Sequence, residues 1–512
     1  MKLFKSTMSI ARTYTAQPGI LRGDIITIEV DLSRGLYSFA VVGLVGKAVE
    51  EAKDRVSAAI KNSGFTSPKS ENQKVVVSLS PADLKKDGPL FDLPIAIAYL
   101  LASGAMKTDI EKTLLIGELS LDGHLREVRG ILPVVIAGKK AGFTEIIVPY
   151  DNQEEAALID GVNIYGAQSL MEVVDHLDKS RTSYSKLGIT KPTQIKEHWT
   201  DTHIRLEDIK GQESAKRGLL IAAAGLHNII MAGPPGTGKT MLARAFQGLL
   251  PPLSKEEALE VMAIHSLVGN SEKEIASAPP FRTPHHTASH TSIVGGGVNP
   301  RPGEVTLSHR GVLFMDEFPE FDRRSLDALR QPLEDRCVTI SRVKGSEKFP
   351  ADFVLVAALN PYRGTEDGST DYASTMMDTY KNKISGPILD RIDLWLNVPH
   401  VDYETLTRKT IENDETKRAR EQVMKARELQ RKRFKNSSAL LNSRISSREL
   451  EELVPLSDEV KDMLRQASVK LNLSPRALHR LIKVARTIAD LEDQTDLALP
   501  HILEALQYRV KM

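Results

Sequence analysis

Apolar and polar residues recur in a regular order over the first third of the chain. Alternation and short apolar runs predict strands, whereas apolar residues three and four positions apart predict helices. The predicted strands are residues 24–30, 37–42, 74–79, 114–117 and 144–148. The predicted helices are residues 45–60, 93–101 and 130–140. Strands that alternate with helices indicate an α/β domain, which we place at residues 1–176.

The pattern changes at residues 177–202, where charged and hydroxyl residues replace the apolar periodicity and predict a linker. A second α/β domain is expected at residues 203–400. Its predicted elements are a helix at 215–224 and apolar strands at 227–232, 311–315 and 353–359. Residues 401–512 have a helical pattern and predict a helical lid domain.

A glycine-rich segment lies between the strand 227–232 and a helix-forming segment. It matches the phosphate-binding pattern G-x-x-x-x-G-K-[ST] at every fixed position. Its residues are Gly233, Pro234, Pro235, Gly236, Thr237, Gly238, Lys239 and Thr240. Glycines let backbone N–H groups point inward at phosphate oxygens, and the helix N-terminus adds its positive dipole end. Lys239 is therefore expected to reach the β- and γ-phosphates of ATP, and Thr240 to ligate Mg²⁺.

Two acidic residues, Asp316 and Glu317, directly follow the strand 311–315. Strand ends line the ligand crevice of a doubly wound sheet, so Asp316 is expected to hold Mg²⁺ and Glu317 to polarise the attacking water. Two acids after a strand also often begin a helix, but the phosphate-binding loop upstream favours the catalytic interpretation. Asn360 follows the strand 353–359 and precedes Pro361, a pattern that by itself is typical of a turn.

Composition narrows the class of protein. An apolar fraction of 41% and a charged fraction of 26% are typical of a globular protein. The formal net charge of +1 gives no global attraction to nucleic acid or membranes, so any DNA-binding surface has to be a local patch. The single cysteine, Cys337, excludes an intrachain disulfide and a cysteine-based zinc site. Without a signal-peptide pattern or a membrane-spanning apolar run, we expect a cytoplasmic protein with no membrane partner.

Three segments of the first domain resemble the proteolytic domain of the Lon proteases. They are Lys86-Asp87-Gly88-Pro89, residues 117–123 and residues 141–149. The resemblance implies a Lon-protease-like α/β fold. It places the nucleophilic serine of those enzymes at Leu90 and their catalytic lysine near Leu132. Leucine can neither act as a nucleophile nor activate one, so peptidase activity is not expected.

Residues 281–290, between the two nucleotide motifs, contain three histidines, His285, His286 and His290. Their spacing matches no common zinc motif and no carboxylate is interleaved, so a surface loop is the ordinary interpretation. Residues 281–290, which contain them, are similar to a segment of the YifB/ComM-type, magnesium-chelatase-like AAA+ ATPases. Residues 326–335 and 384–393 resemble further segments of that family, and the similarity covers essentially the whole chain.

This resemblance implies roles for five further residues. Arg391 is similar to the arginine finger that reaches the γ-phosphate held by a neighbouring subunit, where it would stabilise developing charge. Arg476 resembles a sensor-2 arginine that contacts phosphate in its own subunit. Asn360 matches the sensor-1 position, which orients the attacking water. Ile209 and Gln212 lie at positions whose residues flank the adenine in that family. The ordinary alternatives are a solvated surface for the two arginines and a plain helix entry for Ile209 and Gln212.

The resemblance also implies a ring, expected as a hexamer, that acts on single-stranded or branched DNA. ComM-like branch migration would promote integration of transforming DNA by homologous recombination, with recombination proteins as further partners. A magnesium-chelatase motor subunit, an ATP-dependent protease and a binding-only module remain as alternatives. The many Lys and Arg residues at 415–435 are typical of a solvated helix face and also compatible with DNA contact. Residues 362–365 lack the cysteine cluster that many family members carry there, so no metal or redox role follows from it.

Overall fold

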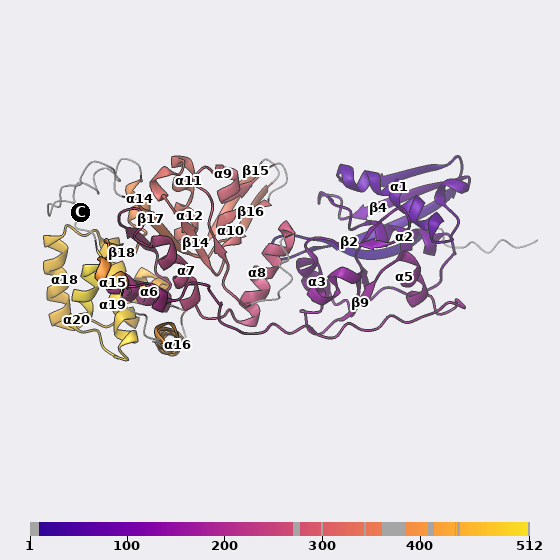
Figure 1. Cartoon of the computed structure of the whole chain (residues 1–512). Coiled ribbons are helices and arrows are strands. Elements are labelled where there is room, and N and C mark those ends of the chain that lie inside the picture. The colour runs from indigo at the N-terminus through magenta and orange to yellow at the C-terminus, as the bar shows by residue number, and fades with distance from the viewer. Residues whose placement is uncertain are drawn as a thin grey trace, which may run out of the picture. The chain divides into compact units, whose positions relative to one another are not determined.

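The computed structural model describes residues 10–269, 277–297, 301–342, 345–360, 384–407, 414–435, 437 and 441–509, with only the backbone at 341–342 and 345–346 (Figure 1). The chain divides into two compact units. Unit 1 comprises Met1–Lys196 and Met262–Ile275, and unit 2 comprises Glu197–Val261 and Ala276–Met512. The helix α8 (Lys255–Val268) begins in unit 2 and ends in unit 1.

Unit 1 contains two main sheets. The larger has the order β1-β2-β4-β3, with strands β1 (Ile10–Gln17), β2 (Asp24–Arg34), β3 (Ser38–Val42) and β4 (Gln73–Ser80). The smaller is parallel in the order β5-β8-β9, with strands β5 (Thr113–Leu115), β8 (Glu145–Pro149) and β9 (Asn163–Ala167). A short hairpin joins β6 (Glu118–Leu119) to β7 (Leu125–Arg126). The helices are α1 (Lys47–Asn62), α2 (Asp92–Ala102), α3 (Ile131–Lys140), α4 (Gln153–Ala156) and α5 (Leu170–Leu177).

The predicted helices and strands of the first domain are confirmed, within a few residues at each end. The strand β1 was not predicted, because threonine rather than an apolar residue occupies two of its buried positions. Thr13 and Thr15 are both 0% exposed. The Thr13 hydroxyl donates a hydrogen bond of 3.0 Å to the carbonyl of Pro94. A buried hydroxyl with a partner is tolerated in a core, but it hides the strand from a hydrophobic pattern.

One buried ion pair links three elements of unit 1. The guanidinium of Arg55 on α1 donates to both carboxylate oxygens of Asp92 on α2, at 2.8 and 3.0 Å. The backbone N–H of Leu119 in β6 donates to the same carboxylate at 3.2 Å. The Asp92 side chain is 0% exposed. Burial raises the pKa of Asp92 to about 6, and the charge and hydrogen bonds of Arg55 limit that rise.

Replacing Arg55 with alanine is expected to destabilise unit 1 by roughly 3–5 kcal/mol at pH 7, because a buried carboxylate loses its counter-ion. The folded pKa of Asp92 lies above its unfolded value, so the folded unit takes up a proton between about pH 4 and 6. The loss should therefore be smaller at pH 5 than at pH 7.

Urea unfolding followed by far-UV circular dichroism would measure this loss, because both tryptophans, Trp199 and Trp395, lie in unit 2 and do not report on unit 1. The matched control is Arg12→Ala, which breaks the exposed pair with Glu29 and should cost under about 1 kcal/mol. Equal losses in the two variants would contradict a special role for the buried pair.

Unit 2 is built on a five-stranded parallel sheet in the order β11-β14-β17-β10-β18. These strands are β10 (Ile229–Ala232), β11 (Phe281–Arg282), β14 (Val312–Met315), β17 (Val354–Leu359) and β18 (Leu394–Asn397). Two antiparallel pairs are separate from it, β12 (Gly295–Gly296) with β13 (Arg301–Pro302) and β15 (Cys337–Arg342) with β16 (Gly345–Pro350). Because the five strands are parallel, all their carboxyl ends lie at one edge of the sheet, called here the carboxyl edge, and their starts lie at the amino edge.

The helices of unit 2 precede, connect and follow these strands. Those up to residue 407 are α6 (Glu213–Gly225), α7 (Lys239–Leu249), α9 (His290–Val294), α10 (Glu304–Leu307), α11 (Arg323–Ala328), α12 (Arg330–Asp335), α14 (Gly386–Leu389) and α15 (Tyr403–Thr407). The later ones are α16 (Glu415–Arg433), α17 (Ser447–Leu453), α18 (Asp458–Lys470), α19 (Pro475–Leu491) and α20 (Leu499–Gln507). The expected strands, the helix before the glycine loop and the helical tail are thus all present.

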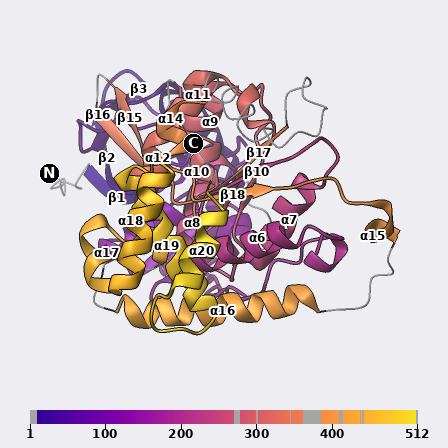
Figure 2. The same ribbon diagram turned by 90° about the vertical axis from the view of Figure 1, so that its left-hand side faces the viewer.

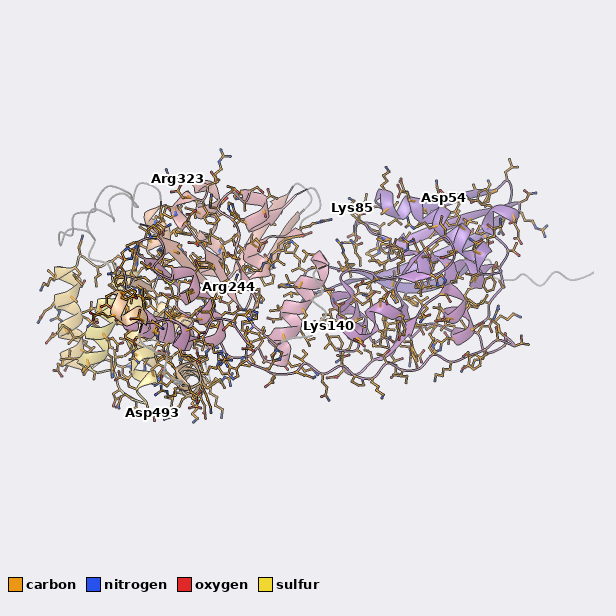
Figure 3. All side chains as sticks on the ribbon, viewed as in Figure 1. Asp54, Lys85, Lys140, Arg244, Arg323 and Asp493 are labelled. Carbon is orange, nitrogen blue, oxygen red and sulfur yellow. The ribbon has the colours of Figure 1, made fainter. Side chains whose placement is uncertain are left out.

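The helical tail shares a core with the sheet. Figure 2 shows α18, α19 and α20 side by side, and α16 packs against both α6 and α19. Side chains fill the interior of the unit between these helices and the strands (Figure 3). One apolar cluster contains Leu219 of α6, Val356 of β17, Val423 of α16 and Ile488 of α19. The tail therefore stabilises the sheet unit directly, and a separate lid domain at residues 401–512 stays a prediction.

Residues 178–205, all of them described, form no named helix or strand, and the two units meet in the sequence at Lys196 and Glu197. Both observations agree with the expected linker, although its limits at 177 and 202 also stay a prediction.

Candidate active site

The glycine loop joins the carboxyl end of β10 to the first residue of α7, Lys239. Gly236 and Gly238 have φ values of +79° and +92°, which side chains with a Cβ rarely adopt. A Cβ on Gly233 would lie 2.1 Å from the carbonyl oxygen of Val398. The Thr237 hydroxyl donates to the carbonyl of Pro234 at 2.9 Å and braces the turn. The fixed glycines of the motif are therefore required by this backbone.

The side chain of Lys239 folds back onto this loop. Its Nζ donates to the carbonyl oxygens of Gly233 and Pro234, at 2.7 and 2.8 Å. The residue is only 6% exposed. Burial lowers the pKa of Lys239, and the nearby charge of Asp316 opposes that shift. A cation held by carbonyl oxygens alone can exchange them for a negatively charged ligand, which would satisfy it better.

The two predicted acidic residues lie beside this loop. Asp316 follows β14, and its Oδ2 accepts a hydrogen bond of 3.3 Å from the Thr240 hydroxyl on α7. The backbone N–H of Glu317 donates to the other carboxylate oxygen of Asp316 at 2.9 Å. Glu317 itself has a φ of +50°, an uncommon conformation for a residue with a side chain. Hydroxyl and carboxylate oxygens placed together are the donor set that Mg²⁺ prefers.

The side chain of Glu317 has a partner that the sequence did not indicate. Nδ1 of His286 lies 3.2 Å from Oε2 of Glu317. The neighbouring histidine, His285, stacks on His286 with ring centroids 4.3 Å apart and bonds to Thr287 instead. Adjacent histidines before the acidic pair were a visible signal, but only the fold determines which of them faces Glu317. The described residues contain no group of three or more His, Cys, Asp or Glu side chains placed to hold a metal.

Asn360 lies at the same edge as the loop and the acids. It follows β17, which pairs with β10 on one side and β14 on the other. Leu359 and Ala232 are partners in that pairing, so Asn360 is level with the start of the glycine loop. The residues after it, 361–383, lie outside the described chain, and these include the positions of the missing cysteine cluster.

Ile209 and Gln212 lie on the approach to α6. Ile209 is 6% exposed and belongs to the apolar core of unit 2. Nε2 of Gln212 donates to the carbonyl of Pro399 at 2.7 Å. The preceding Val398 donates its N–H to Ala232 at 2.8 Å, directly before the loop. Gln212 is thus connected to the beginning of the glycine loop through one short segment.

Arg391 lies at the amino edge, away from the loop. It precedes β18, where the N–H groups of Asp393 and Leu394 donate to the carbonyl of Asn228 before β10. Nη1 of Arg391 donates to Pro387 O at 2.5 Å, and Nη2 pairs with Glu334. Its Nε is buried without a hydrogen-bond partner, and the residue is 8% exposed.

Arg476, at the start of α19, lies with Arg391. Its Nη2 is 3.6 Å from the second oxygen of Glu334. Both arginines line one cavity of about 340 Å³. This position at the amino edge does not support the expectation that Arg476 reaches phosphates held by its own subunit. The predicted site residues thus form two groups, one at each edge of the sheet.

The amino-edge cavity is strongly basic. Nη1 of Arg480 pairs with Oδ1 of Asp393 at 2.7 Å. Burial would raise the pKa of Asp393, but the charge of Arg480 and the N–H of Asn228 hold it below its usual range. Burial lowers the pKa of Lys483 to about 8. At neutral pH this cavity therefore presents positive charge to any group that approaches it.

A glycine loop and an acidic pair at the carboxyl edge of a parallel sheet, with a helical region after it, define a P-loop AAA+ fold. Three family models match the chain: "Magnesium chelatase, subunit ChlI" at residues 205–406, "Subunit ChlI of Mg-chelatase" at 28–152 and "Magnesium chelatase, subunit ChlI C-terminal" at 413–509.

The chain belongs to the ComM/YifB family of magnesium-chelatase-like proteins. It is 42% identical over 509 residues to competence protein ComM of Haemophilus influenzae, covering 98% of both chains. It is also 42% identical over 509 residues to the uncharacterized protein YifB of Escherichia coli, covering 98% of this chain and 97% of that one. Lon protease 2 of Bacillus subtilis is 28% identical over 170 residues, which is 30% of each chain, and this agrees with the Lon-like fold of the first domain.

No helix among the described residues is sufficiently long and apolar to cross a lipid bilayer.

Proposed function

We propose that this protein is an ATPase that works as a ring of identical subunits, expected to be six. The observation that carries the proposal is the separation of the site residues into two groups. Lys239 and Glu317 lie at the carboxyl edge of the sheet, whereas Arg391 lies at the amino edge. In this scheme a single chain holds two half-sites, one at each edge of the sheet. Head-to-tail contacts around a closed ring would bring them together.

Each residue has a chemical role in this scheme. Lys239 would exchange its carbonyl partners for the β- and γ-phosphates, and Thr240 and Asp316 would hold the Mg²⁺ that neutralises phosphate charge. Glu317 would polarise the attacking water, oriented by Asn360. Ile209 and Gln212 would lie against the adenine side of the nucleotide. From the next subunit, Arg391 would stabilise the charge that develops on the γ-phosphate, and Arg476 would accompany it in place of a same-subunit contact.

His286 would restrain this machinery at rest. Its Nδ1 lies against the carboxylate that has to polarise water. His286→Ala is expected to raise the basal rate of ATP hydrolysis about two- to fivefold, the factor that corresponds to one partly exposed polar contact. The measurement is phosphate release without DNA. His290→Ala is the control, because His290 is exposed at the start of α9. A lower rate in the His286 variant would show that this histidine positions Glu317 for catalysis.

The substrate we propose for the motor is DNA. Support comes from the similarity to a competence protein over 98% of the chain. The activity we propose is branch migration of DNA during homologous recombination. It would take place in the cytoplasm, with recombination proteins as partners. The net charge of +1 means that the contact has to be local. The lysines and arginines of α16 are one candidate surface, although Arg420 and Arg427 bond to backbone carbonyls within unit 2.

The test is ATP turnover with single-stranded DNA, a forked duplex and a four-way junction. We expect at least one of them to raise turnover severalfold, and the junction to be converted into separated duplexes only when ATP is hydrolysed. Lys239→Ala protein is the control for contaminating activity. Absence of binding and of stimulation by all three DNA structures would reject DNA as the substrate.

A magnesium-chelatase motor subunit is the second candidate, favoured by the three matching family models. Such a subunit would depend on partner proteins and a tetrapyrrole rather than DNA for full turnover. A protease is disfavoured because Leu90 and Leu132, at the two Lon catalytic positions, are 5% and 0% exposed and lie in the apolar core. Degradation of casein by the purified protein would restore that candidate.

A further inference from the structure

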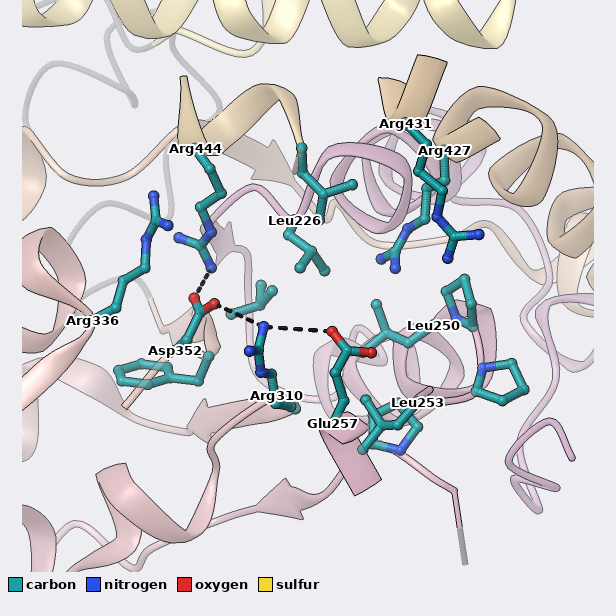
Figure 4. A pocket seen from close by; sticks show the side chains of 17 residues that line it. Leu226, Leu250, Leu253, Glu257, Arg310, Arg336, Asp352, Arg427, Arg431 and Arg444 are labelled. Atoms are coloured by element: carbon teal, nitrogen blue, oxygen red, sulfur yellow. Dashed lines mark hydrogen bonds and ion pairs between the residues drawn. The ribbon is translucent and has the colours of Figure 1, made fainter. Parts of the chain in front are cut away.

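Unit 2 contains a second cavity that the ATPase scheme does not use. It has a volume of about 300 Å³ (Figure 4). Its walls include Gly311 before β14 and Val354 at the start of β17, so it opens at the amino edge of the sheet. The opposite wall comes from α16 and the turn after it, through Arg427, Arg431 and Arg444. It is therefore separate from the glycine loop, which lies at the carboxyl edge.

Arginine dominates the charged lining of this cavity. The five lining arginines are Arg310, Arg336, Arg427, Arg431 and Arg444, and the two lining acids are Glu257 and Asp352. Five positive and two negative charges leave an excess of three positive charges. Such an excess in a concave, partly desolvated space favours a bound anion more strongly than the same charges would on an open surface.

The two acids are already occupied. Arg310 contacts Glu257 at 3.4 Å and Asp352 at 3.6 Å, and it also pairs with Glu260 outside the lining. Arg444 pairs with Asp352 as well, while its Nε is buried without a hydrogen-bond partner. The dashed lines of Figure 4 connect four side chains in a row: Arg444, Asp352, Arg310 and Glu257. Both carboxylates of the lining are therefore already in direct contact with Arg310 or Arg444.

The other three arginines have no carboxylate within ion-pair distance among the described residues, although the charges of Asp352 and Glu257 act on Arg336 and Arg427 from farther away. Arg427 donates only to the backbone carbonyl of Ala223, at 2.7 and 3.2 Å. The guanidinium groups of Arg336 and Arg431 have no hydrogen bond or ion pair within that part of the chain. Burial lowers the pKa of both Arg336 and Arg427 to about 10. Both guanidinium groups remain charged at neutral pH. Burying these charges costs free energy, and a bound anion would reduce that cost.

The remaining wall is apolar. Leu226 lies in the middle of the view in Figure 4, between Arg444 on one side and Arg427 and Arg431 on the other. Leu250 and Leu253 line the same cavity. A ligand that contacts all of these residues has a charged end and an apolar body. Arginine guanidinium groups bind phosphate oxygens in a planar, paired geometry.

We propose that this cavity binds a small organic phosphate of about nucleotide size. Its phosphate contacts Arg336, Arg427 and Arg431, and its base or other apolar part lies on the leucines. The volume lies at the lower end of the range for small-molecule pockets. A polymer such as DNA instead requires a groove that is open at both ends. The bound ligand would contact both the strand starts and α16. Its cavity is next to the one that contains Arg391, because Arg336 and Arg444 line both cavities.

The test uses full-length Lys239→Ala protein, in which the glycine loop is disabled, with AMP and inorganic phosphate as probes in equilibrium dialysis. We expect saturable AMP binding that is at least tenfold weaker in Arg431→Ala and in Arg336→Asn. Asparagine is chosen because residue 336 has a φ of +56°, which asparagine tolerates better than alanine. Lys432→Ala, an exposed residue on the same helix that is absent from the lining, should bind AMP as before.

Three results would overturn the proposal. The first is no saturable AMP binding to the Lys239→Ala protein. The second is equal affinity in the arginine variants and the Lys432→Ala control, with all of them melting at the same temperature. The third is binding of single-stranded DNA, but not of AMP, that depends on Arg336 and Arg431, because the cavity would then serve a polymer. AMP binding more tightly than inorganic phosphate supports a role for the leucine wall, and equal affinity argues against the organic part of the ligand.

Discussion

Replacing Glu317 with glutamine is expected to lower ATP hydrolysis by roughly 10²–10⁴-fold, the usual contribution of a general base. The amide keeps the size of the side chain but cannot accept a proton from water. Lys239, Thr240 and Asp316 are untouched by the change, so the variant should still bind ATP and should accumulate it unhydrolysed. Phosphate release measures the loss of hydrolysis, and the retention of labelled ATP on the purified protein measures the binding that remains.

Two variants sharpen that experiment. Lys239→Ala should lose turnover together with affinity for ATP, since Nζ is the charged group that closes the loop. Glu320→Gln changes an exposed acid three residues away and should leave turnover within about twofold of normal. Hydrolysis at the normal rate by the Glu317→Gln protein would remove this glutamate from the mechanism.

Replacing Arg391 with alanine is expected to lower ATP hydrolysis by about 10³–10⁵-fold, the range seen for arginine fingers. The physical reason is its position. Arg391 lies at the amino edge of the sheet, at the other end of the strands from the loop of its own chain, and its Nε is buried without a hydrogen-bond partner. ATP binding should survive, because the carboxyl edge of each subunit stays intact.

Mixing two inactive proteins tests whether the arginine acts between subunits. An Arg391→Ala subunit supplies an intact loop, and a Lys239→Ala subunit supplies an intact arginine. Contacts between them should restore part of the ATP turnover, whereas either protein alone stays inactive. Arg323→Ala, an exposed arginine on α11 (labelled in Figure 3), is the control for loss of charge. No recovery in rings shown to contain both proteins would mean that Arg391 acts only inside its own chain or stabilises the fold.

Because Arg391 also pairs with Glu334, its loss could act through stability instead. The melting temperature of each variant separates the two effects. Arg391→Lys keeps the charge but not the planar, two-pronged geometry, so it should recover little activity if the side chain contacts phosphate oxygens. Full activity with lysine would contradict a direct contact of that kind.

The elements nearest the loop were predictable because their signals are local. Strand β10, the loop 233–240 and helix α7 form one continuous segment, in which composition and backbone conformation agree. The acids after β14 were predictable for the same reason, since any parallel strand presents its carboxyl end to the ligand edge. The strand β1 was not predicted, because Thr13 and Thr15 occupy two of its buried positions and its pattern is therefore not apolar.

Other features required the whole fold. The pairing of His286 with Glu317 joins residues from two separate loops, and the sequence shows only that both types are present. The common position of Arg391 and Arg476 depends on α19, whose Arg480 bonds to the segment before β18, and both arginines contact Glu334. The arginine-lined cavity combines strand starts with residues of α16 that are far away in the chain.

The sequence by itself determined the chemical groups: a lysine-bearing glycine loop and two acids at a strand end. Those features are set by residue type and by spacing within one strand, turn or helix, which nearby backbone geometry controls. Only the tertiary structure decided that Arg391 and Arg476 lie together at the amino edge of the sheet and which histidine meets Glu317. Such placements depend on the order of strands in the sheet and on long-range packing, because side chains distant in sequence meet only where the core brings them together.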